Sequence, residues 1–163
     1  MTLYLLRHGI AEDSSPGGDT ERQLTRQGTF QVAMIAKGLH KLGVSFDRVI
    51  ASPYLRARET AEIIARITEF NGEIESDRRL VPDVTFNDVS SLIGECADDD
   101  SVLFTGHQPA MGRIVGALCA EGELDIEFRP ATVRVIEVHG YRPLPRGTLL
   151  WSLTPKIFES LMA

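Results

Sequence analysis

Three short segments of this chain have the composition of buried strands, and a polar turn follows each of them directly. Apolar runs of this kind are typical of parallel strands that are covered on both faces. The segments and their turns are 3–6 with Arg7-His8-Gly9, 47–51 with Ser52-Pro53, and 101–105 with Gly106-His107-Gln108-Pro109. Between them lie segments with apolar residues at helical spacing. Strands that alternate with helices indicate a three-layer α/β/α fold around a mostly parallel sheet.

The remaining elements follow from caps, breakers and periodicity. Helices are expected from Thr25 as N-cap to Gly43, from Ser52 as N-cap with Pro53 as first helical residue to about Thr68, over Asn87–Ala97, and from Pro109 to about Ala120. A brief edge strand is expected at Glu73–Glu75, and a closing antiparallel pair at Thr132–Val138 and Leu149–Leu153 around the turn Gly140–Gly147. Glu12–Arg22 is expected to be a polar loop. No repeat or linker divides the chain, so we expect one domain over residues 1–163.

Size and charge limit the classes of function. A chain of 163 residues with 43% hydrophobic residues is long enough to bury one full core. Its net charge of −6 argues against a nucleic-acid-binding protein, because counterion release requires a basic face. Cys96 and Cys119 lack CxxC spacing and are expected to be free thiols in a reducing compartment. Because the sequence shows neither a leader pattern nor a membrane-spanning apolar stretch, we expect a cytoplasmic protein with no membrane partner.

The three turns are expected to converge, because the carboxyl ends of parallel strands lie at one edge of a sheet. Convergence would bring together Arg7, His8, Arg56 and His107 and the beginnings of two helices. A neutral imidazole is a competent nucleophile, a planar guanidinium suits phosphate oxygens, and helix N-termini favour anions. Each residue taken singly has an ordinary structural explanation. Their coincidence at one edge indicates a site for a dianionic phosphoryl group.

These motifs resemble those of the histidine phosphatase superfamily, which has a phosphoglycerate-mutase-like fold. The motif that names the family matches Arg7-His8-Gly9, and its Ser-Pro-x-x-Arg-Ala-x-x-Thr-Ala motif matches Ser52, Pro53, Arg56, Ala57, Thr60 and Ala61. Two further motifs match Leu24-Thr25 with Gly28, and Gly106-His107 before a helix. Because the chain is short and leaves no room for a cap insertion between Thr68 and Ser101, it is most similar to the SixA-type phosphohistidine phosphatases.

The resemblance implies that His8 attacks phosphorus and forms a phosphohistidine intermediate, which water then hydrolyses. The groups that would bind the phosphoryl oxygens are Arg7, Arg56 and His107, with Gly106 beside them and Arg22 as a further candidate. The attacking nitrogen of His8 needs a free lone pair, so the other nitrogen must donate to a fixed acceptor. The neighbouring arginines should keep His8 neutral. Because guanidinium groups would neutralise the charge, neither a metal nor another cofactor is expected.

Many members of the family supply an acid that protonates the leaving oxygen. Here residues 79–83 read Arg-Leu-Val-Pro-Asp, with no acid directly after Leu80. Asp83, Glu12 and Asp19 remain candidate proton donors, and the spacing selects none of them. General acid catalysis is typically worth about 10²–10⁴-fold and matters most for a poorly leaving alkoxide. An imidazole leaves more readily, so the missing acid favours a P–N bond in the substrate.

A site without a cap also fits a protein substrate. The resemblance therefore implies a histidine-phosphorylated partner, either a phosphotransfer domain of a histidine kinase or a phosphocarrier protein of sugar uptake. Two alternatives stay open. One is a phosphatase of small phosphate esters that uses Asp83 or Glu12 as its acid, and the other is a non-catalytic module that binds phosphorylated partners.

Overall fold

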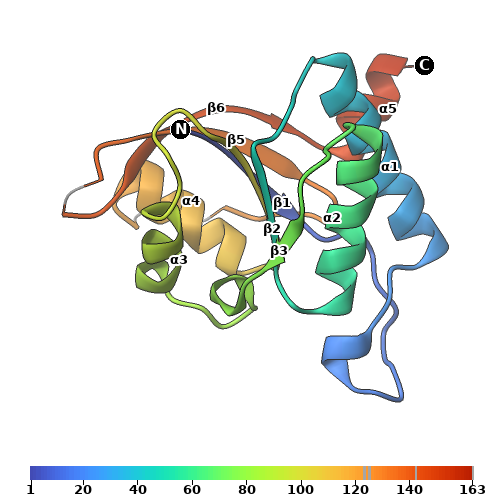
Figure 1. Ribbon diagram of the computed structural model, residues 1–163. Coiled ribbons are helices and arrows are strands. Elements are labelled where there is room, and N and C mark those ends of the chain that lie inside the picture. The colour runs from blue at the N-terminus through green and yellow to red at the C-terminus, as the bar shows by residue number, and fades with distance from the viewer. Residues whose placement is uncertain (123, 125, 142, 163) are drawn as a thin grey trace.

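A sheet of six strands forms the middle of the computed structural model, which describes residues 1–122, 124, 126–141 and 143–162 (Figure 1). The strands are β1 (Thr2–Arg7), β2 (Arg48–Ala51), β3 (Ile74–Ser76), β4 (Ser101–Gly106), β5 (Val133–His139) and β6 (Arg146–Leu153). Their order across the sheet is β3-β2-β4-β1-β5-β6. Neighbours from β3 to β1 pair in parallel, whereas β5 is antiparallel to both β1 and β6. The predicted sheet, mostly parallel with an antiparallel closing pair, is confirmed.

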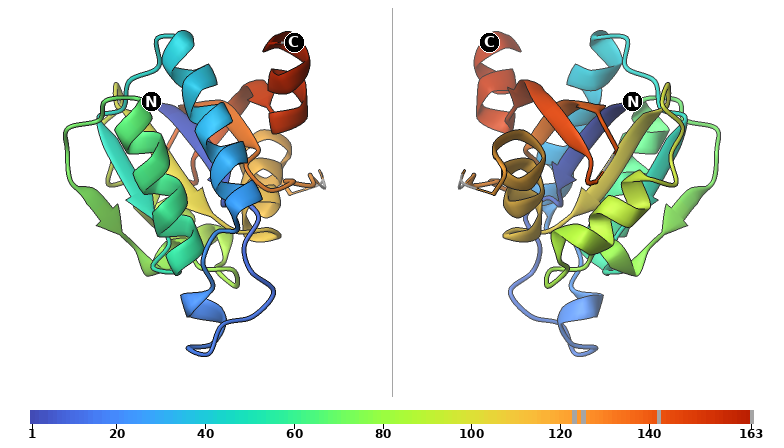
Figure 2. Two further views of the ribbon diagram at one scale, coloured as in Figure 1. Left: turned by 90° about the vertical axis from the view of Figure 1, so that its right-hand side faces the viewer. Right: turned by 90° about the vertical axis from the view of Figure 1, so that its left-hand side faces the viewer.

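Helices cover both faces of the sheet, which confirms the three-layer arrangement (Figures 1 and 2). They are α1 (Arg26–Lys41), α2 (Leu55–Ile67), α3 (Phe86–Ile93), α4 (Ala110–Ala120) and α5 (Pro155–Met162), with short 3-10 turns η1 (Asp19–Glu21) and η2 (Arg78–Leu80). α1, α2 and α5 lie on one face, and α3 and α4 lie on the other. Among the helices of the described ranges, none is long and apolar enough to cross a bilayer.

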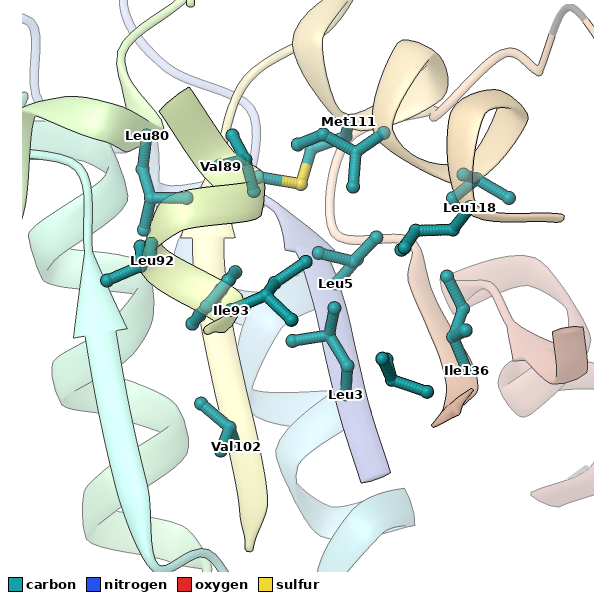
Figure 3. Close-up of a cluster of buried hydrophobic side chains, with 14 of the residues drawn as sticks. Leu3, Leu5, Leu80, Val89, Leu92, Ile93, Val102, Met111, Leu118 and Ile136 are labelled. Carbon is teal, nitrogen blue, oxygen red and sulfur yellow. The ribbon is translucent and has the colours of Figure 1, made fainter. Parts of the chain in front are cut away.

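β1 contributes side chains to both layers of the core. Leu3 and Leu5 belong to the cluster under α3 and α4, where Figure 3 shows them beside Ile93. Tyr4 and Leu6 belong to the second cluster, on the side of α1 and α2. Successive residues of a strand point to opposite faces, so a strand covered on both sides is apolar at every position. This is why the run before Arg7 shows no polar alternation.

The beginning of α2 differs from the prediction. The helix begins at Leu55 with Tyr54 as its N-cap, so the prediction of Ser52 as N-cap and Pro53 as first helical residue is wrong. The reason is that Ser52 continues the hydrogen-bond ladder of the sheet, with its N–H donating to the carbonyl oxygen of Thr105 at 2.9 Å. The Ser52 side chain is thereby held in the interior, fully buried.

Two other elements have bounds that the sequence pattern misplaced. α3 ends at Ile93 with Gly94 as C-cap, rather than at the expected Ala97. β6 begins at Arg146, inside the expected turn, and the pairing of Arg146 with His139 extends the hairpin. α3 thus stops at a glycine, a common helix-ending residue, whereas the start of β6 is set by its pairing with β5.

The C-terminal helix α5 was not expected from the pattern of apolar residues. Its start nevertheless carries ordinary signals, because Thr154 Oγ1 accepts a hydrogen bond from the N–H of Ile157 and Pro155 is the first helical residue. With 8 residues, the helix is too short for its 3.6-residue period to stand out. It packs against α1 beside the edge strands of the sheet.

Candidate active site

The three turns singled out in the sequence lie side by side because β4 lies between β1 and β2. Arg7 at the end of β1 is in register with Gly106 at the end of β4, and β2 pairs with the other side of β4. The turns therefore open at the same edge of the sheet. The rings of His8 and His107, which are 99 positions apart in the numbering, have their centroids 5.1 Å apart.

His8 is buried, and one of its ring nitrogens is fixed by the backbone. Nδ1 lies 2.6 Å from the carbonyl oxygen of Gly9, which can only accept, so Nδ1 carries the proton. Nε2 is then unprotonated, and its lone pair accepts a hydrogen bond from Nε of Arg56 at 3.2 Å. Burial lowers the pKa of His8 to about 4, and the charges of nearby arginines also lower it. His8 is therefore neutral near pH 7, which is the protonation state of a nucleophile.

Arg56 connects His8 to the loop between β1 and α1. Besides its bond to His8, its Nη1 donates to the carbonyl oxygen of Asp19 at 2.6 Å and its Nη2 donates to the Asp19 carboxylate at 3.1 Å. The same carboxylate accepts from Nη1 of Arg22 at 2.8 Å. Hydrogen bonds from Arg22 and Arg56 lower the pKa of Asp19. An ionised Asp19 is a poor proton donor, and its contacts instead orient the guanidinium of Arg56.

His107 follows β4 and is held by a residue that follows β2. Its Nε2 lies 2.8 Å from Oγ of Ser52, and its Nδ1 is buried without a hydrogen-bond partner in the part of the chain that the structure describes. When the Ser52 hydroxyl donates to Nε2, Nδ1 carries the proton and can donate to an anion. Burial lowers the pKa of His107 to about 2, and the charges of His8 and Arg56 lower it as well. His107 is therefore a neutral donor.

Arg7 is held by the segment that precedes β5. Its Nη1 donates to the carbonyl oxygen of Phe128 at 2.6 Å, whereas its Nε is buried and unpartnered among the described residues. Burial lowers the pKa of Arg7, which indicates that the desolvated charge is only partly compensated. Gly106 permits the close packing here: its carbonyl accepts from the N–H of His8 at 3.0 Å, and a Cβ at Gly106 would come within 2.3 Å of Cε of Met111.

The weaker candidates lie at the rim or apart from this cluster. Arg22 lies at the rim, where it donates to Asp19 and to the backbone carbonyl of Glu12. Glu12 is thus placed near the cluster through its main chain. Asp83 lines a separate groove of about 610 Å³ beside Gln108, and no contact within the described residues joins it to His8.

Two residues to which the sequence analysis gave no role support the cluster. Thr60 Oγ1 accepts from the N–H of Gly9 at 3.2 Å and donates to the carbonyl oxygen of Arg56 at 2.7 Å, which ties the turn after β1 to α2. The ring of Tyr54 lies 4.9 Å from the guanidinium of Arg56 and 5.0 Å from the ring of His107. The position of Thr60 one helical turn after Arg56 could have indicated its role, whereas no sequence signal distinguishes Tyr54.

The arrangement places Nε2 of His8, which is unprotonated, among three side chains that can donate hydrogen bonds. The donors are the guanidinium groups of Arg7 and Arg56 and the imidazole of His107, which lie at or after the ends of β1, β2 and β4. Such a set suits in-line attack on phosphorus with stabilisation of the charge on the equatorial oxygens. Within the described ranges, no three His, Cys, Asp or Glu side chains are grouped so as to hold a metal ion, and Cys96 and Cys119 are free thiols.

Comparison with known proteins agrees with this chemistry. The family model of the histidine phosphatase superfamily (branch 1) matches residues 3–82. Phosphohistidine phosphatase SixA of Escherichia coli (strain K12) is 27% identical over 157 residues, which cover 95% of this chain and 94% of the relative. A SixA homologue of Haemophilus influenzae is 32% identical over 144 residues, covering 82% of this chain and 85% of the relative.

A solved structure of the protein histidine phosphatase SixA complexed with tungstate has the same fold. Its TM-score is 0.88 at 27% sequence identity, and the superposition covers 96% of this chain and 99% of that one. The match extends through β4 and α4, beyond the residues matched by the family model. The chain therefore belongs to the histidine phosphatase superfamily, in which it is a phosphatase.

Proposed function

We propose that this phosphatase hydrolyses the P–N bond of phosphohistidine in a phosphorylated protein, with His8 as the nucleophile. The observation that carries the proposal is the pair of contacts made by the His8 ring. Nδ1–H donates to the carbonyl oxygen of Gly9, and Nε2 faces the guanidinium of Arg56 with its lone pair. A ring held in this tautomer is prepared for attack through Nε2.

In the first step, Nε2 of His8 forms a bond to phosphorus while the bond from phosphorus to the substrate nitrogen breaks. The substrate imidazole retains the electron pair of that bond and, if its other nitrogen already carries a proton, leaves as a neutral ring. In the second step, water attacks the phosphoryl group on His8, phosphate is released, and the lone pair returns to Nε2. The proton of the water passes to solvent or phosphate. Arg7, Arg56 and His107 stabilise the charge on the oxygens in both steps.

Among the described residues, no carboxylic acid is placed to protonate a leaving group at His8, and this supports a P–N substrate. Asp19 is paired with two arginines, and Asp83 lies in another groove. An alkoxide leaving group would need a donor at this position, whereas a phosphohistidine whose other ring nitrogen is protonated needs none. The names of the SixA relatives, which are phosphohistidine phosphatases, support the same substrate class.

A protein substrate is supported by the placement of the segment between α2 and β4. In other arrangements such a segment could cover the site, but here residues 68–100 form β3 at the edge of the sheet, the short turn η2, and α3 on one face of the sheet (Figure 1). We therefore propose that a phosphohistidine exposed on a phosphotransfer domain or a phosphocarrier protein reaches His8.

The test is phosphate release from a phosphocarrier protein phosphorylated on histidine. The wild type should release phosphate, and His8→Ala should lose at least about 10³-fold of that rate, because the covalent route is removed. His40→Ala, at an exposed position of α1, is the matched control and should keep the wild-type rate. Mass spectrometry after acid-free quenching should find a phosphoryl group on His8. Rapid hydrolysis of p-nitrophenyl phosphate without release from the phosphoprotein would overturn the proposed P–N substrate.

A further inference from the structure

A cavity of about 390 Å³ lies beside the candidate active site, between β5, α1 and the first turn of α5. The lining residues that matter here are Gln31, Glu127, Arg129, Thr132, Arg134 and Lys156. None of the four residues of the catalytic cluster is among the lining residues. The cavity is therefore a separate feature of the surface.

Backbone hydrogen bonds fix the wall of this cavity to the catalytic turn. The N–H of Arg7 donates to the carbonyl oxygen of Thr132 at 3.1 Å, and the N–H of Ala131 donates to the carbonyl oxygen of His8 at 3.1 Å. Ile10, two residues after His8, also lines the cavity. A ligand in the cavity would consequently be held at a fixed position relative to a phosphoryl group at His8.

Three polar atoms of the cavity wall are buried without a hydrogen-bond partner among the described residues. They are Oε1 of Gln31, Oγ1 of Thr132 and Nε of Arg134. Thr132 is 1% exposed. Buried polar groups are nearly always hydrogen-bonded, so three such atoms around one cavity favour a polar partner there, either water or a ligand. Because a Gln amide can be turned to present either oxygen or nitrogen, all three residues can act as donors.

The charge of the wall indicates that this ligand is an anion. The guanidinium of Arg134 lies 4.7 Å from the ring of Phe128 and donates from Nη2 to the carbonyl oxygen of Glu127 at 3.0 Å. Burial lowers the pKa of Arg134, and no carboxylate of the described residues lies within ion-pair distance of it. Arg129 and Lys156 add exposed positive charges at the rim, and the carboxylate of Glu127, 3.9 Å from Nε of Arg129, adds one negative charge, so the cations of the lining exceed its carboxylates. A desolvated guanidinium without a carboxylate is costly, and an anion would compensate it.

We propose that this cavity binds the carboxylate of an Asp or Glu side chain that lies close to the phosphohistidine of the protein substrate. The inference rests on the proposed function, because the Asp or Glu side chain that would enter the cavity belongs to the phosphoprotein substrate. The guanidinium of Arg134 donates to the carboxylate, and rotation of the Thr132 and Gln31 side chains, whose polar atoms are buried in this structure, completes the donor set. The pair of sites would select substrates with an acidic residue beside the phosphorylated histidine.

The first experiment measures binding without turnover. ¹⁵N-labelled wild type is titrated with N-acetyl-aspartate amide, N-acetyl-asparagine amide and inorganic phosphate, and the Nε–H signal of Arg134 is followed by NMR. The aspartate compound should shift this signal saturably, and the asparagine compound should not. Absence of a shift with aspartate would overturn the proposal. A shift with phosphate alone would assign the cavity to a free anion and would equally overturn it.

The second experiment measures selectivity in turnover. Two phosphohistidine peptides are compared, one with Asp beside the phosphorylated residue and one with Asn at that position. The wild type should prefer the Asp peptide in kcat/KM by about tenfold, the scale of hydrogen bonds to a charged group. Arg134→Met and Thr132→Val should remove most of this preference and leave the rate with the Asn peptide unchanged. Thr132→Val is informative because the hydroxyl it removes bonds no described residue, so the fold should be retained.

Arg66→Met is the matched control, since Arg66 is an exposed arginine on α2 outside this cavity. It should keep the preference of the wild type. If both peptides lose rate equally in Arg134→Met, the residue supports the catalytic turn and the carboxylate site is wrong. If the wild type hydrolyses neither peptide but the aspartate compound still shifts the Arg134 signal, the proposed function fails while the anion site stands.

Discussion

Nε of Arg56 donates a hydrogen bond to Nε2 of His8 across 3.2 Å, in the interior of the protein. A guanidinium can only donate, so this contact requires an unprotonated Nε2. It acts together with the bond from Nδ1 to Gly9, and the two contacts leave the His8 ring a single tautomer. Arg56, which we propose to bind phosphoryl oxygens, thus also keeps Nε2 of His8 unprotonated, as the proposed nucleophilic attack requires.

The two buried histidines should make the protein less stable in mild acid. The folded-state pKa of His8 is lowered from 6.5 to about 4, and that of His107 is lowered to about 2. Between pH 6.5 and about 4 the unfolded chain therefore binds more protons than the folded protein, so stability is fully present above pH 6.5 and falls as the pH is lowered through this window. Each histidine contributes a slope of up to about 1.4 kcal/mol per pH unit. Urea unfolding at pH 7 and pH 5 measures the difference, and a free energy of unfolding that is equal at both would contradict it.

Asp19→Asn should separate an orienting role of Asp19 from a role as proton donor. The substitution weakens the contacts to Arg56 and Arg22, which are charge-assisted in the wild type. We expect kcat/KM for a phosphohistidine peptide and for p-nitrophenyl phosphate to fall by a similar factor, about tenfold. A large loss confined to the ester would show that Asp19 donates a proton. Glu21→Gln, in the same 3-10 turn, serves as the control.

Ser52→Ala should destabilise the protein and disturb the protonation of His107. Both side chains are buried, and removal of the hydroxyl leaves Nε2 of His107 without its partner at 2.8 Å. An unsatisfied buried group of this kind costs about 1–3 kcal/mol. Chemical denaturation measures the loss, and Ser45→Ala at an exposed position should be neutral. If Ser52→Ala is as stable as the wild type, the hydrogen bond contributes little to folding.

Gly28→Ala should reduce activity from a position on α1. A Cβ at Gly28 would lie 2.0 Å from the carbonyl oxygen of Ile10, a backbone atom two residues after His8. The helix and the catalytic turn must then move apart, and overpacking of this kind costs about 1–3 kcal/mol. We expect both a lower free energy of unfolding and a lower kcat. Gly94→Ala, where a Cβ would meet only ordinary contacts at 3.5 Å, is the matched control. Equal activity of both variants would contradict the expected displacement.

The sequence allowed the sheet and the four central residues of the cluster to be placed at one edge. The continuous apolar run of β1 and the glycine turn after it are local signals, and the parallel arrangement follows from the alternation of strands and helices. These two facts bring Arg7, His8 and His107 together without any knowledge of side-chain contacts. Arg56 follows because it lies in the first turn of the helix after β2.

The contacts that tune the cluster could not be predicted in the same way. The bond between Ser52 and His107 depends on the register of β2 against β4, which no local pattern specifies. Asp19 lies in an irregular loop, so its pairing with Arg56 has no periodic signal. The buried polar atoms that lack hydrogen-bond partners among the described residues near Arg134 come together only when β5, α1 and α5 are packed against one another.

The strand order also has a consequence for the synthesis of the protein. β1 and β2 are made first, yet they do not touch, because β4 is inserted between them. When the first hundred residues have left the ribosome, His8 and Arg56 are already present on the nascent chain, but the strand that lies between β1 and β2 in the sheet is not. The side-by-side placement of the turns after β1 and β2 therefore depends on β4, which is made after both of them and is followed directly by His107.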